Sequence, residues 1–146
     1  MKVREAMTND VCVTSPDRSI REAARLMSQI DAGALPVGEN DRLVGMITDR
    51  DIAVRAVAEG KSLETQVGDV MSKEVLYCFD DEDLDDVARN MSDVKVRRLP
   101  VLNREKRLVG ILSFGDLALH EDARTTGRTI AHISEHGGAH SQVHHA

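Results

Sequence analysis

Apolar residues recur at helical spacing in two stretches of the chain. In the first stretch they stand at i, i+3, i+4, i+7 and i+10: Ile20, Ala23, Ala24, Met27 and Ile30. The second stretch keeps this spacing: Leu84, Val87, Ala88, Met91 and Val94. Ser19 and Glu22 form a capping-box pattern before the first stretch, and Asp83 is the expected cap of the second. The spacing predicts two amphipathic helices whose apolar faces belong to a core.

Two short apolar runs follow each predicted helix and indicate a β-hairpin. The first hairpin reads "ALPV" (34–37), a polar turn, and "LVGMI" (43–47), and the second reads "LPV" (99–101) and "LVGIL" (108–112). Each hairpin leads into a further helix, predicted to run from near Thr48 to Gly60 and to begin near Ser113. Short helical turns, "VREAM" and "VGDVM", and extended runs, "VCV" and "VLYC", precede the amphipathic helices.

The order short helix, strand, helix, strand, strand, helix therefore occurs twice, and the sequences correspond as well. "RLVGMITDRDI" (42–52) returns as "RLVGILSFGDL" (107–117). We assign repeat 1 to residues 1–61, repeat 2 to residues 62–122, and a polar, mobile tail to residues 123–146. A repeat of about 60 residues buries little surface alone. We therefore expect an α/β (α+β) fold in which the repeats pack face to face with pseudo-twofold symmetry.

Composition limits the partners that the chain can have. The net charge is −6 and aromatic residues make up 2% of the chain, with no Trp. There is thus no basic footprint or stacking platform for nucleic acid. No apolar run approaches the roughly 20 residues of a membrane span, and the start lacks the apolar core of a secretory signal. We expect a cytoplasmic protein in which Cys12 and Cys78 are small apolar residues of reduced strands.

The tail carries histidines at a spacing of four: His132, His136, His140 and His144. On a helix these would form one metal-binding face. However, Gly137 and Gly138 interrupt such a helix, and no Cys or carboxylate completes a structural zinc pattern. We therefore predict no metal site.

Both hairpins end in the pattern Gly-x-x-(Thr/Ser)-x-x-Asp, formed by Gly45, Thr48 and Asp51 and by Gly110, Ser113 and Asp116. A hydroxyl followed three residues later by an acid is a helix capping box. The same arrangement suits a nucleoside phosphate, because a helix N-terminus attracts phosphate and a carboxylate can accept hydrogen bonds from a ribose diol. The glycine admits either a ligand or a neighbouring backbone. Both interpretations stay open on these residues.

The ordered motifs resemble a known family. "VREAMT" and "VGDVMS", "GALPV" and "RRLPV", and "GMITDRDI" and "GILSFGDL" are similar to the motifs of the cystathionine β-synthase (CBS) domain. Residues 1 to about 120 resemble a tandem pair of these domains, the Bateman module. The resemblance implies two β-α-β-β-α repeats with three-stranded sheets facing each other. It also implies a regulatory sensor that binds AMP, ADP, ATP, S-adenosylmethionine or sometimes NAD in clefts between the repeats.

The resemblance also implies a set of binding residues. Thr48 and Ser113 would contact phosphate or ribose, and Asp51 and Asp116 would accept the ribose hydroxyls. The adenine would lie between the backbones of residues 34–35 and 99–100 and two valines: Ala34, Leu35, Leu99, Pro100, Val11 and Val75.

Basic residues distinguish the two sites. Arg97 and Arg98 stand where relatives bind phosphate, and guanidinium groups suit it; the alternative is plain solvent exposure. The first copy has no arginine there, although Arg50 could reach a phosphate. One site would then prefer charged phosphates, whereas the other would be weaker, take an uncharged adenosyl group or stay empty.

We expect a ligand-sensing module that signals through its shape or assembly, is a homodimer, requires no cofactor and acts on an unidentified protein. An enzyme is not expected, because no nucleophile–base pair or P-loop is visible and all six histidines lie at 120 or later. The alternative is a structural dimerisation module with degenerate sites and no physiological ligand.

Overall fold

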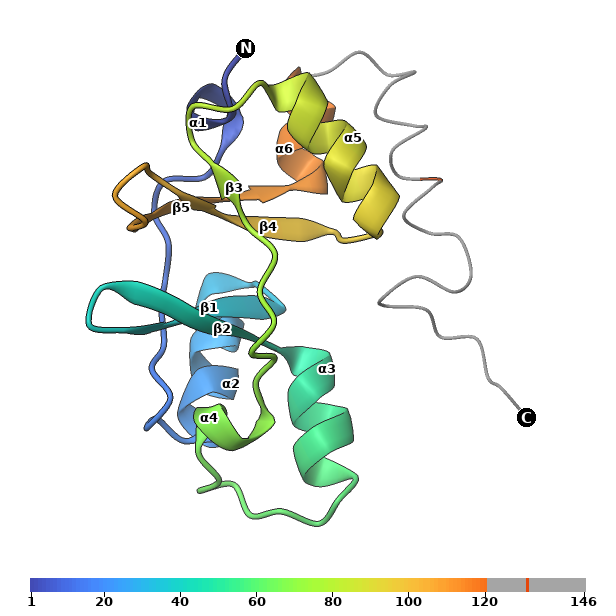
Figure 1. Cartoon of the computed structure of the whole chain (residues 1–146). Coiled ribbons are helices and arrows are strands. Elements are labelled where there is room, and N and C mark those ends of the chain that lie inside the picture. Colours follow the sequence, from blue (N-terminus) through green and yellow to red (C-terminus); the bar gives the residue numbers. More distant parts are fainter. Residues whose placement is uncertain (121–130, 132–146) are drawn as a thin grey trace. The chain divides into compact units, whose positions relative to one another are not determined.

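The computed structural model describes residues 1–120 and residue 131, and it has a mixed α/β fold (Figure 1). The predicted tail and its four spaced histidines lie outside the described residues, except for Ala131. The chain forms two compact units. We call residues 12–75 the first-hairpin unit, and residues 1–11 together with residues 76–120 the second-hairpin unit.

The units do not follow the repeat boundaries at 61 and 62. The opening segment of repeat 1 packs with the hairpin of repeat 2, and the opening segment of repeat 2 packs with the hairpin of repeat 1. The chain therefore passes from one unit to the other twice, after Val11 and after Val75.

The first-hairpin unit contains α2 (Ile20–Ile30), β1 (Ala34–Glu39), β2 (Arg42–Thr48), α3 (Asp49–Asp51), the π-helix η1 (Ile52–Val57) and α4 (Val67–Val70). Strands β1 and β2 are antiparallel, and their register runs from Ala34 opposite Thr48 to Glu39 opposite Arg42. Asn40 and Asp41 take positive φ in the two-residue turn between them, as such tight hairpins require. The predicted helix after Thr48 is thus present, with a π-helical second half.

The second-hairpin unit contains α1 (Val3–Ala6), β3 (Cys78–Phe79), α5 (Leu84–Val94), β4 (Arg98–Leu102), β5 (Leu108–Ser113) and α6 (Phe114–His120). Its sheet has the order β3-β4-β5, with β3 parallel to β4 and β4 antiparallel to β5.

The predicted third strand of the first unit is reduced to a single parallel bridge between Thr14 and Val37. The reason is visible at the next ladder position. In the second unit the Asp80 N–H donates to the Leu102 carbonyl at 2.9 Å. The residue that corresponds to Asp80 in the first unit is Pro16, which has no N–H to donate. The expected three-stranded sheet is therefore complete only in the second-hairpin unit.

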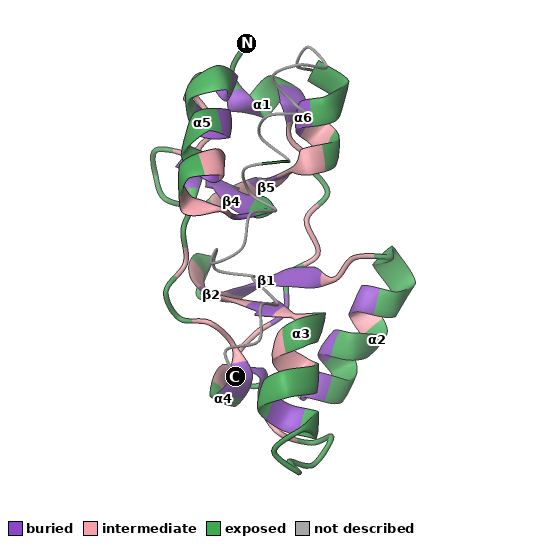
Figure 2. Ribbon diagram, turned by 90° about the vertical axis from the view of Figure 1, so that its right-hand side faces the viewer, coloured by how far each residue is buried: buried purple, intermediate pink, exposed green. Residues whose placement is uncertain are grey.

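The two predicted amphipathic helices are present as α2 and α5, and Figure 2 shows buried residues along one side of each. Ala24 and Ile30, predicted in the core, are exposed. Ser19 Oγ accepts the Glu22 N–H at 3.1 Å, but the Glu22 carboxylate pairs with Arg18 and does not complete the box. Asp83 occupies the N-cap position of α5 without a side-chain cap bond.

The strand glycines admit a neighbouring backbone. Met46 and Ser72 exchange backbone hydrogen bonds of 3.0 and 2.9 Å, and a Cβ on Gly45 would lie 2.7 Å from the Met71 sulfur. In the second unit Ile111 and Thr8 exchange bonds of 3.0 and 2.9 Å. A Cβ on Gly110 would lie 2.5 Å from the Met7 sulfur. Each glycine thus lets the opening segment of the other repeat cross its strand, which is the second of the two predicted alternatives.

The two cysteines are free, Cys12 half-buried and Cys78 buried in β3. Burial raises the pKa of the Cys78 thiol to about 12, with smaller contributions from Glu82 and Asp80. Cys78 therefore stays protonated, as expected of a small apolar core residue.

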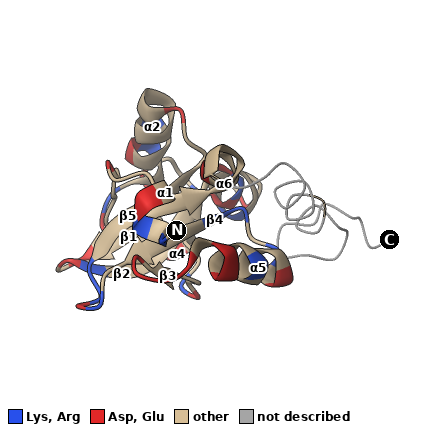
Figure 3. Cartoon of the chain, turned by 90° about the horizontal axis from the view of Figure 1, so that it is seen from above, with Lys and Arg blue, Asp and Glu red and all other residues tan. Residues whose placement is uncertain are grey.

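Charged residues of both signs are spread over the described chain, and acidic residues are concentrated along α5 (Figure 3). No helix of the described residues is long and apolar enough to cross a membrane.

We predict that Gly45→Ala and Gly110→Ala each lower the free energy of unfolding by about 1–3 kcal/mol, the usual cost of overpacking. At both positions the added methyl group would meet backbone as well as a methionine side chain. Gly115→Ala is the control, because its Cβ would have ordinary contact distances, 3.6 Å from Ser113 Oγ. Urea unfolding of the three variants checks this. Equal free energies of unfolding for all three variants would contradict the close contact between each strand glycine and the opening segment of the other repeat.

Candidate functional site

The hydroxyl–acid pairs lie where the last strand of each hairpin meets a helix. Thr48 is the final residue of β2 and the N-cap of α3, and Asp51 lies on the first turn of α3. Ser113 is the final residue of β5, and Asp116 lies on the first turn of α6. The strand end and the helix start thus fix both members of each pair.

Both pairs form capping boxes. The Thr48 N–H donates to Asp51 Oδ2 and the Asp51 N–H donates to Thr48 Oγ1, each at 3.0 Å. The Ser113 N–H donates to Asp116 Oδ2 at 2.9 Å, and the Asp116 N–H donates to Ser113 Oγ at 3.4 Å. The capping interpretation is therefore confirmed. In each pair the cap uses Oδ2 of the aspartate and leaves Oδ1 to other partners.

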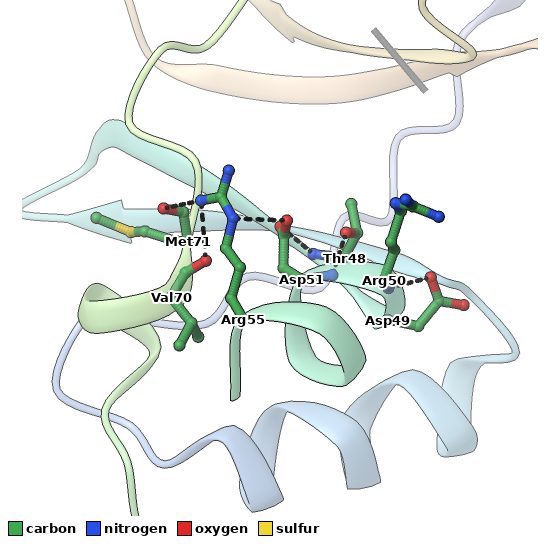
Figure 4. A network of polar contacts seen from close by, with 7 residues as sticks. All are labelled: Thr48, Asp49, Arg50, Asp51, Arg55, Val70 and Met71. Carbon is green, nitrogen blue, oxygen red and sulfur yellow. Dashed lines mark hydrogen bonds and ion pairs between the residues drawn. The ribbon is translucent and has the colours of Figure 1, made fainter. Parts of the chain in front are cut away.

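In the first-hairpin unit, Oδ1 of Asp51 faces an arginine (Figure 4). Arg55 Nε lies 3.8 Å from this oxygen, and the Asp51 side chain is only 15% exposed. One terminal nitrogen of Arg55 also donates to the carbonyls of Val70 and Met71 at 3.4 and 3.3 Å. Arg55 thus ties Asp51 to the end of α4. The sequence reasoning missed Arg55, although its i, i+4 spacing from an acid was a usable signal.

In the second-hairpin unit a hydroxyl takes this place. Thr8 Oγ1 donates to Asp116 Oδ1 at 3.4 Å. The residue that corresponds to Arg55 is His120, which is exposed at the end of α6. In both units, therefore, the acid contacts the opening segment of the other repeat, through a guanidinium in one unit and directly in the other.

The first turn of α3 has its amides occupied. The Asp49 N–H donates to the Gly33 carbonyl at 2.9 Å, and the Arg50 N–H donates to Asp49 Oδ1 at 2.8 Å. The third amide is that of Asp51, which Thr48 caps. This helix start is thus satisfied by the protein's own groups.

The predicted binding residues divide between the units. The first-hairpin unit holds Ala34, Leu35, Thr48, Arg50, Asp51 and Val75. The second-hairpin unit holds Val11, Arg97, Arg98, Leu99, Pro100, Ser113 and Asp116. The strand residues predicted to contact adenine are buried, the two valines are half-buried, and the three arginines are exposed.

The hairpin register identifies equivalent positions in the two units. Ala34 lies opposite Thr48 as Arg98 lies opposite Ser113. Arg98 therefore corresponds to Ala34, and Arg97 corresponds to Gly33. The first unit has no guanidinium at either of these positions.

One pocket lies apart from the hydroxyl–acid pairs. It has a volume of about 620 Å³ and lies beside α2 in the first-hairpin unit. Its lining includes Val13, Arg18, Arg25 and Leu26 and none of the predicted binding residues. We give the hydroxyl–acid pairs more weight, because the pocket is open and Arg18 in it is already paired with Glu22. Within residues 1–120, no group of three or more His, Cys, Asp or Glu side chains could hold a metal ion.

The chain is similar in sequence and fold to known proteins. The family model described as CBS domain matches residues 3–57 and 67–121. The CBS domain-containing protein YhcV of Bacillus subtilis (strain 168) is 39% identical over 143 residues, 97% of this chain and 98% of YhcV. The crystal structure of Hypoxic Response Protein I with two coordinated zinc ions covers 84% of this chain and 100% of that chain, with 33% identity and a TM-score of 0.75.

The CBS domain pair of protein MJ0100, crystallised with 5′-methylthioadenosine and S-adenosyl-L-methionine, is also similar. It covers 82% of this chain and 94% of that chain, with 28% identity and a TM-score of 0.72. The repeats, their hairpins and these matches lead to one conclusion: the chain belongs to the CBS domain family and carries two CBS domains in tandem.

Proposed function

We propose that this chain is a cytoplasmic regulatory module that binds adenosyl ligands, namely AMP, ADP, ATP or S-adenosylmethionine, at its hydroxyl–acid pairs. Ligand binding would change its conformation or assembly, and an unidentified protein partner would respond. The observation that carries this proposal is the same in both units. Each cap orients an aspartate through Oδ2, and Oδ1 faces a contact that a ligand hydroxyl could replace.

The chemistry suits a ribose. An ionised carboxylate offers about four lone-pair sites, and the cap uses only part of them. Hydrogen bonds to a charged group contribute about 1.5–3 kcal/mol each, enough to select for sugar hydroxyls. The ligands of the MJ0100 domain pair, 5′-methylthioadenosine and S-adenosyl-L-methionine, both carry an adenosyl group and support this proposal.

Catalysis is not part of the proposal. Burial keeps the pKa of the Cys78 thiol near 12, far above that of a reactive thiolate. No histidine precedes His120 in the sequence to activate Cys12.

A second candidate function is a structural dimerisation module with degenerate sites and no physiological ligand. The complete capping boxes favour it, because capping alone is a sufficient reason for a hydroxyl and an acid at this spacing. The two candidates differ in what the aspartates do beyond capping.

We predict that Asp51→Asn and Asp116→Asn each remove binding at one site. Wild-type protein with an adenosyl ligand at 100 times its dissociation constant should gain about 2.7 kcal/mol of stability. Each variant should also lose up to about 1 kcal/mol of intrinsic stability from its weakened cap. Thermal shift and calorimetry with AMP, ATP and S-adenosylmethionine measure both effects.

Ser19→Ala is the matched control, because it removes a side-chain cap at α2 without touching the pairs. It should lower the stability and leave the ligand affinity unchanged. If the aspartate variants behaved in the same way, only the structural candidate would remain.

We predict that Arg98→Ala weakens AMP and ATP binding by about tenfold, or 1.4 kcal/mol, and leaves adenosine binding nearly unchanged. The exposed guanidinium would contact the phosphate, to which arginine can form charge-assisted bonds. Added salt should reduce the difference because it screens exposed charges. Isothermal titration at two salt concentrations measures it. Equal losses for nucleotide and nucleoside would refute the phosphate contact.

We predict a homodimer held by helices. Apolar side chains are exposed on α2, η1 and α6: Ile30 at 38%, Val54 at 47%, Val57 at 61% and Leu119 at 79%. Covering them would remove apolar surface from water. Light scattering of the wild type should give twice the chain mass, and Val57→Asp should shift it toward the monomer. A wild-type mass equal to that of one chain at every concentration would exclude the dimer.

A further inference from the structure

Asp49 holds a carboxylate over the start of β1. A Cβ on Gly33 would lie 2.8 Å from Asp49 Oδ2, so the carboxylate fills the space that a side chain there would need. The Asp49 N–H donates to the Gly33 carbonyl at 2.9 Å, and Asp49 Oδ1 accepts the Arg50 N–H at 2.8 Å. The carboxylate is therefore held over Gly33 by one backbone hydrogen bond, from Arg50, which Figure 4 shows, although Asp49 as a whole is exposed.

The second-hairpin unit has a basic residue at the position equivalent to Gly33. Arg97 corresponds to Gly33 by the hairpin register. Phe114 follows Ser113 as Asp49 follows Thr48, so no carboxylate stands there. One site thus has two guanidinium groups at the strand start, whereas the other has a carboxylate.

The first three backbone amides of α3 are not available to bind a phosphate. They donate to Gly33, Asp49 and Thr48. A phosphate would have to displace these bonds and lie close to the Asp49 charge. Arg50 and Asp49 are both exposed, so water and salt weaken the attraction of the guanidinium and the repulsion of the carboxylate alike. Of the two charges, the carboxylate is the one held against the start of β1.

We propose that Asp49 determines the specificity of the first-hairpin site. This site excludes 5′-phosphates and takes adenosyl ligands whose 5′ substituent is neutral or positively charged, such as a thioether or a sulfonium group. The inference rests on the proposed function, since it assumes that Asp51 accepts the ribose hydroxyls.

The test uses full-length protein carrying Asp116→Asn, which confines binding to the first-hairpin site. Titration calorimetry compares 5′-methylthioadenosine with AMP in this parent and after Asp49→Asn. In the parent, 5′-methylthioadenosine should bind at least about tenfold more tightly than AMP. Asp49→Asn should strengthen AMP binding about tenfold and change 5′-methylthioadenosine binding by less than about twofold. Asp17→Asn, an equal charge change at an exposed residue of the same unit, should alter neither.

A second titration keeps Asp116, in case its replacement unfolds the protein. Here Asp49→Asn should convert binding of one AMP per chain into binding of two. If AMP bound the parent more tightly than 5′-methylthioadenosine, the attraction of Arg50 for the phosphate would exceed the repulsion by Asp49. That result would overturn this inference and leave the proposed function standing. A gain for both ligands, or an unchanged AMP affinity, would also overturn this inference. If no adenosyl ligand bound the wild type, the proposed function and this inference would both fall.

Discussion

The crossing of a strand glycine by the opening segment of the other repeat is the contact on which both units depend. At Gly45 and at Gly110 a methionine and the backbone of the next residue approach closer than any side chain would allow. Two backbone hydrogen bonds follow in each case. The hydrophobic core of each unit then includes the short opening helix, through Val67 and Val70 in one unit and Val3 and Ala6 in the other.

The aspartates connect this framework to the candidate sites. Each aspartate caps its own helix with one oxygen. The other oxygen contacts the opening segment directly at Asp116, through Thr8, and indirectly at Asp51, through Arg55. Capping and ligand binding therefore do not exclude each other, because the cap orients the carboxylate. A ligand hydroxyl on Oδ1 would compete with Arg55 or Thr8, and so with contacts to residues close to the points where the chain leaves each unit. The two candidate sites share the capped aspartate but differ in the charged residues around it, Asp49 in one unit and Arg97 and Arg98 in the other.

Much of the fold could be predicted from the sequence, because local patterns decide it. The helical stripes of α2 and α5, the hairpins and the helices after Thr48 and Ser113 all follow from periodicity, turn residues and caps. The exchange of opening segments could not be predicted in this way, since periodicity does not say which copy a segment packs against. Pro16 did carry a signal for the shortened ladder. Arg55 and Asp49 acquire their significance only from neighbours in the folded chain, the carbonyls after α4 and the backbone of Gly33.

The double passage of the chain between its units ties the folding of each repeat to the presence of the other. In this structure the opening segment of each repeat packs on the hairpin of the other repeat. A chain with a single repeat could form the same contacts only with a second molecule. With two repeats in one chain these contacts are intramolecular. The linker then sets their effective concentration, which does not depend on the protein concentration.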